Sequence, residues 1–212
     1  MKSIWYWLCR NVCRLFCILF FSFRVYGLEN VPENGPFILA SNHQSYLDPV
    51  LCGVSIKRQL IFLARNTLFR NRFFKWLILS LNAVPLRRGE ADVAAIKDVI
   101  QKLRHGYGVC LFPEATRTND GRIASLKPGF GLLCRRGNAR LVPVVIDGAF
   151  ECWPRDKKFF SWGTIAVCYG KVIPTEELQQ KDNKQIADEV TNMLRQMQSD
   201  IRKKRGKKPF VY

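Results

Sequence analysis

The fold is decided by the stretch Pro36-Phe37-Ile38-Leu39-Ala40-Ser41-Asn42-His43-Gln44-Ser45-Tyr46-Leu47-Asp48-Pro49. Its short apolar beginning predicts a buried strand, and Asp48-Pro49 is typical of a helix start. A spacing of five places His43 and Asp48 about 140° apart on a helix and on opposite faces of a strand. The two side chains can therefore meet only if the chain turns between them, and a turn between a strand and a helix is a common place for chemistry.

The rest of the chain alternates predicted strands and helices. We expect strands at residues 37–41, 60–64, 83–86, 108–112, 141–146 and 164–170. Apolar residues at helical spacing predict helices over 93–103, closed by Gly106, and over 186–201. This alternation predicts an α/β fold with a mixed, mostly parallel sheet flanked by helices.

Length and charge predict one domain with short terminal additions and an anionic partner. The 212 residues are 48% apolar, which is enough to bury a full core. We expect a helix in residues 1–26, the main domain in 27–201 and a basic tail in 202–212. The net charge of +17 suits nucleic acid, an anionic bilayer or a phosphorylated substrate. The tail is interpreted either as a solvated segment or as a contact for membrane or RNA.

The eight cysteines indicate reduced thiols. The sequence contains no C-x-x-C spacing and only two histidines, a pattern that argues against a structural zinc site. Most of the cysteines fall in or near apolar runs, which is typical of buried thiols in a cytosolic compartment.

Residues 4–23 predict a long helix that associates with a membrane. The segment is rich in Trp, Phe, Leu, Ile and Cys and would form about 30 Å of helix. Two arginines, Arg10 and Arg14, would each cost roughly 2.5 to 3.5 kcal/mol inside a membrane span. With Asn11 they gather on one side of a helical wheel, which predicts a helix lying in the interface with its arginines toward the headgroups. Packing against the domain is the alternative.

A second segment, residues 66–81, also mixes large apolar side chains with basic ones. Leucines, phenylalanines and Trp76 alternate with Arg70, Arg72 and Lys75. The pattern fits a second membrane-facing helix and a plain core element equally well.

His43 and Asp48 together predict a general base. Each has a structural interpretation of its own, His43 as a loop histidine and Asp48 as a helix cap ahead of Pro49. A carboxylate that holds one N–H of an imidazole, however, fixes the tautomer and raises the basicity of the other ring nitrogen. There is no G-x-S-x-G motif, and Ser45 is interpreted as a turn residue. We therefore expect direct attack by a substrate hydroxyl or water.

Four blocks in chain order then carry a resemblance to a known family. They are Asn42 to Asp48, Val84-Pro85-Leu86-Arg87-Arg88-Gly89, Phe112-Pro113-Glu114-Ala115-Thr116-Arg117 and Val142-Pro143-Val144-Val145. The order resembles the glycerolipid acyltransferases that share an Asn-His-x-x-x-x-Asp motif, above all the 1-acyl-sn-glycerol-3-phosphate (lysophosphatidic acid) acyltransferases.

The resemblance implies roles for particular residues. His43 would take the proton from the acceptor hydroxyl, Asp48 would orient His43, and the hydroxyl would attack the thioester of acyl-CoA or acyl carrier protein. Arg88, supported by Arg87, would bind the acceptor phosphate, a task suited to a forked guanidinium. The other implied substrate-binding residues are Glu114, Thr116, Arg117 and Pro143. From the residues alone, the arginine pair also fits an exposed basic pair, and Glu114 fits a cap or an ion pair with Arg117.

The resemblance also sets expectations for substrates and location. It implies phosphatidic acid as product, no cofactor or metal, membrane lipids as partners, and a place at the cytoplasmic face of the inner (plasma) membrane. The family usually has Gly where this chain has Ala115, whose methyl group restricts positive φ. Another lysolipid acceptor, such as a lysophospholipid, an ornithine lipid or a lipid A precursor, is therefore the alternative. A basic membrane- or nucleic-acid-binding module without catalysis is the alternative from a different class.

Overall fold

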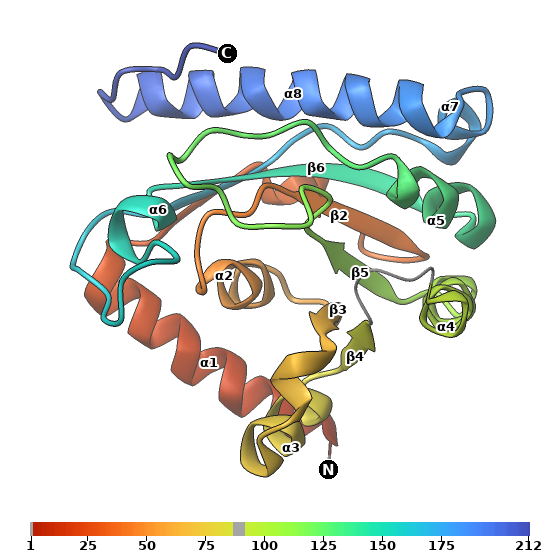
Figure 1. Ribbon diagram of the computed structural model, residues 1–212, viewed down its shortest axis with the longest axis horizontal. Coiled ribbons are helices and arrows are strands. Elements are labelled where there is room, and N and C mark those ends of the chain that lie inside the picture. The colour runs from red at the N-terminus through yellow and green to blue at the C-terminus, as the bar shows by residue number, and fades with distance from the viewer. Residues whose placement is uncertain (1, 87–91) are drawn as a thin grey trace.

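The computed structural model describes residues 2–86 and 92–212, and within them seven strands form a single sheet (Figure 1). The strands are β1 (Arg24–Tyr26), β2 (Phe37–Ser41), β3 (Leu60–Arg65), β4 (Ala83–Leu86), β5 (Gly108–Leu111), β6 (Arg140–Asp147) and β7 (Ala166–Tyr169). Their order is β1-β7-β6-β2-β5-β3-β4. Only β6 and β7 are antiparallel among these described neighbours. The predicted α/β class with a mixed, mostly parallel sheet is confirmed.

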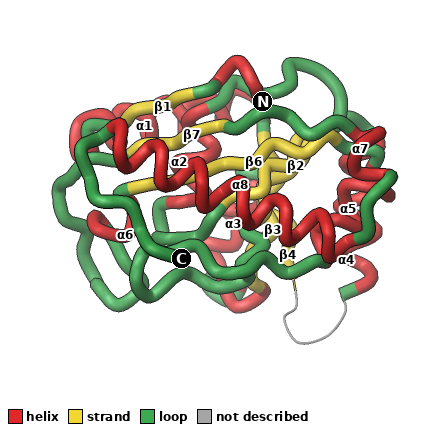
Figure 2. Tube along the Cα trace, turned by 90° about the horizontal axis from the view of Figure 1, so that it is seen from above, coloured by secondary structure: helices red, strands yellow, loops and turns green. Residues whose placement is uncertain are grey.

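Helices cover both faces of the sheet, as Figures 1 and 2 show together. They are α1 (Lys2–Phe21), α2 (Asp48–Ser55), α3 (Arg72–Ser80), α4 (Val93–Arg104), α5 (Gly129–Gly137), α6 (Ala149–Cys152), α7 (Thr175–Gln179) and α8 (Asn183–Lys204). Two short 3-10 turns are Leu28–Asn30 and Asn66–Phe69. α4, α5 and α8 lie on one face, and α1 and α2 lie on the other.

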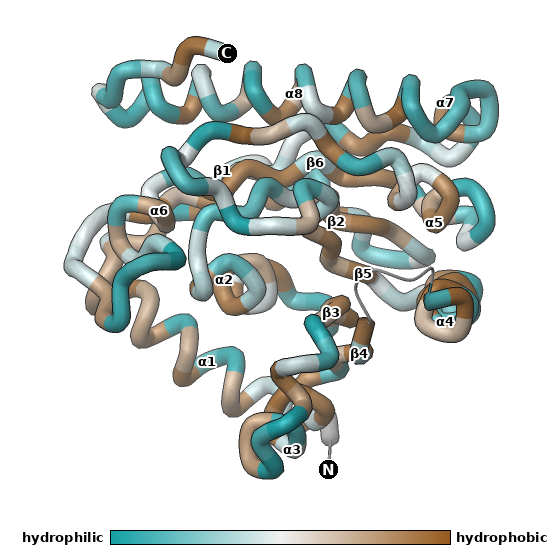
Figure 3. The backbone as a smooth tube through the Cα atoms, in the orientation of Figure 1, coloured by the Kyte–Doolittle hydropathy of each residue, from teal (hydrophilic) through white to brown (hydrophobic). Residues whose placement is uncertain are grey.

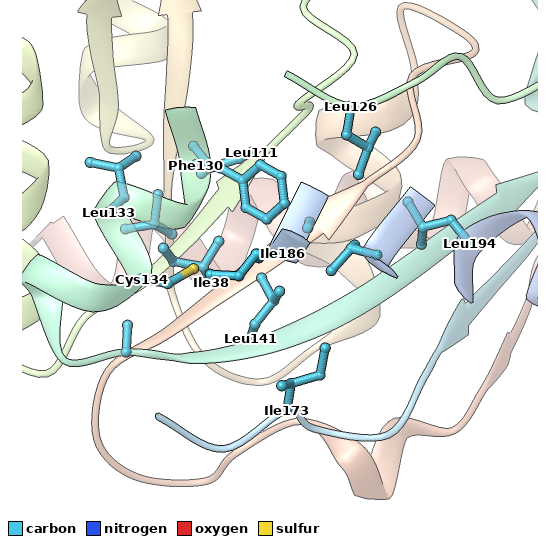
Figure 4. Close-up of a cluster of buried hydrophobic side chains, with 14 of the residues drawn as sticks. Ile38, Leu111, Leu126, Phe130, Leu133, Cys134, Leu141, Ile173, Ile186 and Leu194 are labelled. Atoms are coloured by element: carbon cyan, nitrogen blue, oxygen red, sulfur yellow. The ribbon is translucent and has the colours of Figure 1, made fainter. Parts of the chain in front are cut away.

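The central strand β2 contributes side chains to both halves of the core, because successive side chains of a strand point to opposite faces of the sheet. Ile38 and Ala40 pack with side chains of α4, α5 and α8, as the close-up in Figure 4 shows for Ile38. Phe37 and Leu39 point to the opposite face and pack with side chains of α1 and α2. Each large side chain buried in this way stabilises the fold by roughly 1.5 to 3 kcal/mol.

The sheet brings together two of the four sequence blocks, Asn42 to Asp48, called the first motif from here on, and Phe112 to Arg117, called the second motif. β2 and β5 are adjacent and parallel, with Ala40 opposite Leu111. The residues that follow the two strands, Asn42 on one side and Phe112 on the other, therefore leave the sheet side by side. Ligands of open α/β sheets bind outside the carboxyl ends of the strands, which is the edge where these residues lie.

α1 packs along the domain instead of standing apart from it. Tyr6, Cys17 and Phe21 are buried, and α1 contacts α2. The predicted orientation of Arg10 toward headgroups is wrong, because its Nε donates to the carbonyl of Ile56 at 2.9 Å. Residues 4–21 still form the one described helix that is long and apolar enough to cross a membrane by length and composition. Its outward stripe stays exposed and consists of Ile4, Leu8, Val12, Leu15, Ile18 and Leu19.

The segment 66–81 is not a core element. It folds as the 3-10 turn Asn66–Phe69 and as α3, which starts after the cap Asn71, whose side chain accepts from the N–H of Phe74. No residue of α3 is buried, and Phe73 and Trp76 are strongly exposed. The core interpretation of this segment is therefore wrong, and the interpretation as a second membrane-facing helix stays a prediction.

The basic C-terminal segment is not a solvated tail. Arg202 and Arg205 pair with the fully buried Asp147 at 2.8 and 2.6 Å, and Lys207 lies 3.4 Å from the same carboxylate. Asp147 ends β6, and a buried carboxylate is stable only with compensating charge and hydrogen bonds. The sequence pattern could not reveal this pairing because the acid lies 55 or more positions away in the chain.

Candidate active site

The catalytic turn is built around the carboxylate of Asp48. Its Oδ2 lies 2.7 Å from Nδ1 of His43 and also accepts from the backbone N–H groups of Gln44 at 2.6 Å and Ser45 at 2.7 Å. The helix itself starts at Asp48 with Pro49 next and has no side-chain cap. Asp48 therefore closes the turn instead of capping α2, and the predicted contact between the imidazole and the carboxylate is present.

Asn42 fixes the point where the chain leaves β2. Its side-chain amide donates to the carbonyl of Ile146 at 2.9 Å, and its Oδ1 accepts from the N–H of the same residue at 2.7 Å. Both bonds are buried, so they hold the start of the turn on the neighbouring strand β6. Asn42 belongs to the sequence motif, but spacing in the sequence does not predict that it binds the backbone of Ile146.

The second motif and the residue that follows it, Thr118, surround His43 on three sides. The ring of Phe112 stacks on the imidazole with centroids 4.4 Å apart, Glu114 Oε1 accepts from the backbone N–H of His43 at 2.7 Å, and the N–H of Thr118 donates to its carbonyl at 2.8 Å. Within residues 2–86 and 92–212 no group hydrogen-bonds Nε2. The imidazole is 18% exposed. Nε2 is thus the ring atom left to meet a substrate proton.

Glu114 is tied to backbone and not to Arg117. Its second oxygen, Oε2, accepts from the N–H of Ala124 at 2.9 Å. Burial raises the pKa of Glu114 to about 7, while the two backbone bonds lower it and Asp48 raises it further. Its geometry is that of a residue that positions His43. The predicted role in substrate binding stays a prediction.

The guanidinium of Arg117 lies over an aromatic ring of the first motif. Its guanidinium carbon is 3.6 Å from the ring centroid of Tyr46, and within the described chain its Nη1 is buried without a hydrogen-bond partner. Arg117 adjoins Thr118, whose N–H donates to the carbonyl of His43. A planar cation with an unused donor is suited to a phosphate. Tyr46 was not predicted as a site residue, because nothing in the sequence shows that its ring contacts Arg117.

Ala115 adopts the conformation that the family's usual glycine would favour. Its φ is +62°, in the left-handed region, where a side chain costs roughly 1 to 2 kcal/mol. Ala115 is exposed, as is the neighbouring Thr116. The methyl group is accommodated at the surface, with the turn of the second motif formed around it.

The three other predicted substrate-binding residues are Pro143, Arg87 and Arg88. Pro143 is buried within β6 and pairs with Ala40, so it belongs to the sheet and not to the loops around His43. Arg87 and Arg88 lie outside the described residues. β4 ends directly before them, at Leu86. The roles of all three stay predictions.

No cluster of metal ligands accompanies the site. Within the described ranges, no group of three or more His, Cys, Asp or Glu side chains is arranged to hold a metal ion. All eight cysteines are unpaired.

Comparisons with known proteins find acyltransferases. The family model described as Acyltransferase matches residues 22–147. The chain is 26% identical over 200 residues to the 1-acyl-sn-glycerol-3-phosphate acyltransferase of Bacillus subtilis, covering 94% of this chain and 98% of the relative. It is 29% identical over 158 residues to the chloroplastic acyltransferase LPAT1 of Arabidopsis thaliana, covering 73% of this chain and 44% of that longer protein.

A solved structure shares the fold. The crystal structure of the 1-acyl-sn-glycerophosphate (LPA) acyltransferase PlsC from Thermotoga maritima superposes with a TM-score of 0.75 at 26% identity, covering 91% of this chain and 80% of that one. The family model covers more than half of the chain, and the residues that meet around His43 lie within it. The chain therefore belongs to the acyltransferase family, and it is an O-acyltransferase.

Proposed function

We propose that the enzyme transfers a fatty acyl group from the thioester of acyl-CoA or acyl carrier protein to the free hydroxyl of 1-acyl-glycerol-3-phosphate, giving phosphatidic acid. The names of the relatives support the acceptor and the product. The observation that carries the chemistry is the 2.7 Å contact between Asp48 Oδ2 and His43 Nδ1, which leaves Nε2 as the base.

In this proposal the acceptor hydroxyl gives its proton to His43 Nε2 as its oxygen attacks the thioester carbonyl carbon. The carboxylate of Asp48 stabilises the imidazolium that forms, since it lies against the other ring nitrogen. Collapse of the tetrahedral intermediate breaks the C–S bond, and the departing sulfur takes the proton from Nε2. The ester and the free thiol leave, and His43 and Asp48 return to their starting state without an acyl-enzyme.

The acceptor phosphate is proposed to bind Arg117, whose stacked guanidinium stands beside the catalytic turn with one unused donor. Arg88, supported by Arg87, is proposed to bind the same phosphate on the strength of the sequence motif. Thr116 and Pro143 are retained as proposed acceptor- and donor-side residues on the same ground.

The enzyme is proposed to act at a membrane surface, on the cytoplasmic face of the inner (plasma) membrane. Exposed apolar side chains form a stripe along α1 and continue on α3, where Phe73 and Trp76 face outward. The rings of Trp5 and Trp76 join the two helices with centroids 5.7 Å apart. Figure 3 shows α1 and α3 at the periphery, on the side away from α8. A helix with an exposed apolar stripe suits the headgroup boundary of a bilayer.

The proposal is tested by acyl transfer with the purified protein. Radiolabelled acyl-CoA and acyl carrier protein donors are offered with lysophosphatidic acid, with lysophospholipids that bear a headgroup, and with other lysolipids. We expect phosphatidic acid as the main product from lysophosphatidic acid. Preferred turnover of a different lysolipid would overturn the assigned acceptor, and absence of transfer to every acceptor would overturn the proposed reaction.

A further inference from the structure

The segment between α6 and β7 exposes two large aromatic side chains. In the aromatic loop, defined as residues 153–163, Phe159 is 82% exposed and Trp162 is 72% exposed. Arg155, Lys157 and Lys158 are exposed beside them. Soluble surfaces carry single apolar residues without consequence, but two exposed aromatics three residues apart, with cations beside them, suggest a surface with a partner.

The loop is held in place on α1. The ring of Phe160 lies 5.3 Å from that of Phe16, and the ring of Trp162 lies 4.7 Å from that of Phe20. The N–H of Ser161 donates to the carbonyl of Cys152 at 2.7 Å. Figure 1 shows the chain after α6 running beside α1. These contacts fix the position of the loop that exposes Phe159 and Trp162.

The loop continues the apolar face described above. Trp76 lies at the N-terminal end of α1 and Trp162 at its other end, so exposed tryptophans flank the outward stripe of a helix about 30 Å long. Tryptophan is enriched at the boundary between headgroups and hydrocarbon, because its ring is apolar and its N–H is polar.

The charge of the loop suits an anionic bilayer. Three cations and one acid, Asp156, occupy positions 155–158. Basic side chains at a membrane surface are attracted by anionic lipids, and this attraction falls off within a Debye length.

The base of the loop also contacts the catalytic turn. Ser45 Oγ donates to the carbonyl of Trp153 at 2.6 Å, and the hydroxyl of Tyr46 donates to the carbonyl of Arg155 at 3.4 Å. The rings of Tyr46 and Trp153 are 5.6 Å apart. The turn that carries His43 is thus braced by the segment that presents the exposed aromatics.

We propose that the aromatic loop is a second lipid-contact element, which inserts Phe159 and Trp162 into the headgroup boundary of an anionic bilayer and thereby holds the catalytic turn at the membrane surface. The inference rests on the proposed function, since it assumes that the acceptor is presented by a membrane. It identifies a contact beyond α1 and α3.

The first test measures lipid contact without activity. The full-length protein and Trp162→Phe are mixed with phosphatidylcholine vesicles containing phosphatidylglycerol, with and without brominated acyl chains. The difference in fluorescence between the two proteins is the emission of Trp162. We expect this emission to be quenched by the brominated lipids, and an unquenched Trp162 on vesicle-bound protein would overturn the proposal.

The second test measures affinity. Phe159→Ser with Trp162→Ser should weaken vesicle binding on the order of tenfold or more, because two large apolar surfaces lose a buried environment. Tyr107→Ser, which changes another exposed aromatic at the start of β5, should leave binding unchanged. Lys157→Glu with Lys158→Glu should weaken binding to anionic vesicles most at low salt, whereas Lys97→Glu with Lys184→Glu should not. Equal binding by the loop variants and their controls would contradict the inference.

Activity separates this inference from the proposed function. With a short-chain, water-soluble lysophosphatidate and no vesicles, Phe159→Ser with Trp162→Ser should keep the wild-type rate. With acceptor embedded in vesicles its rate should fall along with its binding. If wild type transfers no acyl group but Trp162 is quenched, the lipid contact stands and the proposed reaction falls. If the double variant transfers acyl groups at the wild-type rate in both assays, the loop does not hold the catalytic turn at the membrane surface and the proposal is wrong.

Discussion

Glu114 accepts a hydrogen bond from the backbone N–H of His43, with 2.7 Å between Oε1 and the nitrogen. The two residues lie 71 positions apart, and the bond joins the two motifs at the edge of the sheet where β2 and β5 end. Because its other oxygen binds the N–H of Ala124, the buried carboxylate holds the backbone on both sides. Glu114 thereby sets the position of the imidazole without touching its ring.

The pKa of Glu114 predicts a dependence of stability on pH. The folded-state pKa of about 7 lies above the ordinary value of 4.5, so the folded protein binds this proton more tightly than the unfolded chain. The stability that this group contributes is full below pH 4.5 and is lost as the pH rises to about 7. One pKa unit corresponds to about 1.4 kcal/mol, so the loss amounts to about 3 kcal/mol.

Urea unfolding of wild type and Glu114→Gln across this pH range measures the effect. The difference in unfolding free energy between the two proteins should fall as the pH rises, since Gln does not titrate. Asp120→Asn changes an acid that is strongly exposed, and its unfolding free energy should depend on pH in the same way as that of wild type. Parallel curves for wild type and Glu114→Gln would show that Glu114 does not titrate in this range.

Asp48→Asn should separate the shape of the catalytic turn from its charge. The amide keeps an oxygen for the backbone N–H groups of Gln44 and Ser45 but no longer stabilises an imidazolium. We expect kcat to fall roughly 10²- to 10⁴-fold, with a loss of about 1 to 3 kcal/mol in unfolding free energy. Asp98→Asn, on the outer side of α4, serves as the matched control. A kcat within a few fold of wild type would remove Asp48 from the mechanism.

Arg117 should act on acceptor binding. Arg117→Lys keeps the charge but loses the planar stack on Tyr46, so the KM for lysophosphatidic acid should rise on the order of tenfold with little change in kcat. Tyr46→Phe retains the ring and should behave as wild type, whereas Tyr46→Ala should resemble Arg117→Lys. The exposed Arg122 provides the control, Arg122→Lys. An unchanged KM in Arg117→Lys and Tyr46→Ala would rule out this role.

Asp147 should stabilise the C-terminal segment. Asp147→Asn leaves Arg202 and Arg205 partly buried without their counter-charge, so unfolding free energy should fall by about 3 to 5 kcal/mol. Glu151→Gln, in the more exposed acid of the same cluster, should cost less than about 1 kcal/mol. Equal and small losses in the two variants, measured by urea unfolding, would mean that the ion pairs do not stabilise the fold.

Most strands could be predicted because each buried strand is a short apolar segment of the sequence between turn residues. β2 was predicted with its observed ends, and β6 and β7 were predicted to within two residues. β1 was missed, because it is three residues long and has no fully buried side chain. α5 was missed because three glycines weaken its helical pattern. One of them, Gly137, is needed there, since a Cβ would stand 2.5 Å from Leu103 Cδ1.

The pairing of His43 with Asp48 could be predicted because both residues lie in one short turn. The partners of Asn42 and Glu114 could not, because they depend on which strands become neighbours in the sheet. The face that α1 presents was predicted only in part. Hydrophobic periodicity shows that a helix has two sides, but it does not show that Arg10 reaches a carbonyl of the domain.

The central claim is that the imidazole of His43 removes the proton from the acceptor hydroxyl. It is tested most directly by the single-turnover rate of acyl transfer to lysophosphatidic acid in His43→Ala, with His105→Ala as the control at an exposed histidine. We expect a rate at least about 100-fold below wild type in His43→Ala, with folding and acceptor binding retained, and a wild-type rate in His105→Ala. Acyl transfer by His43→Ala at the wild-type rate would show that His43 is not the base.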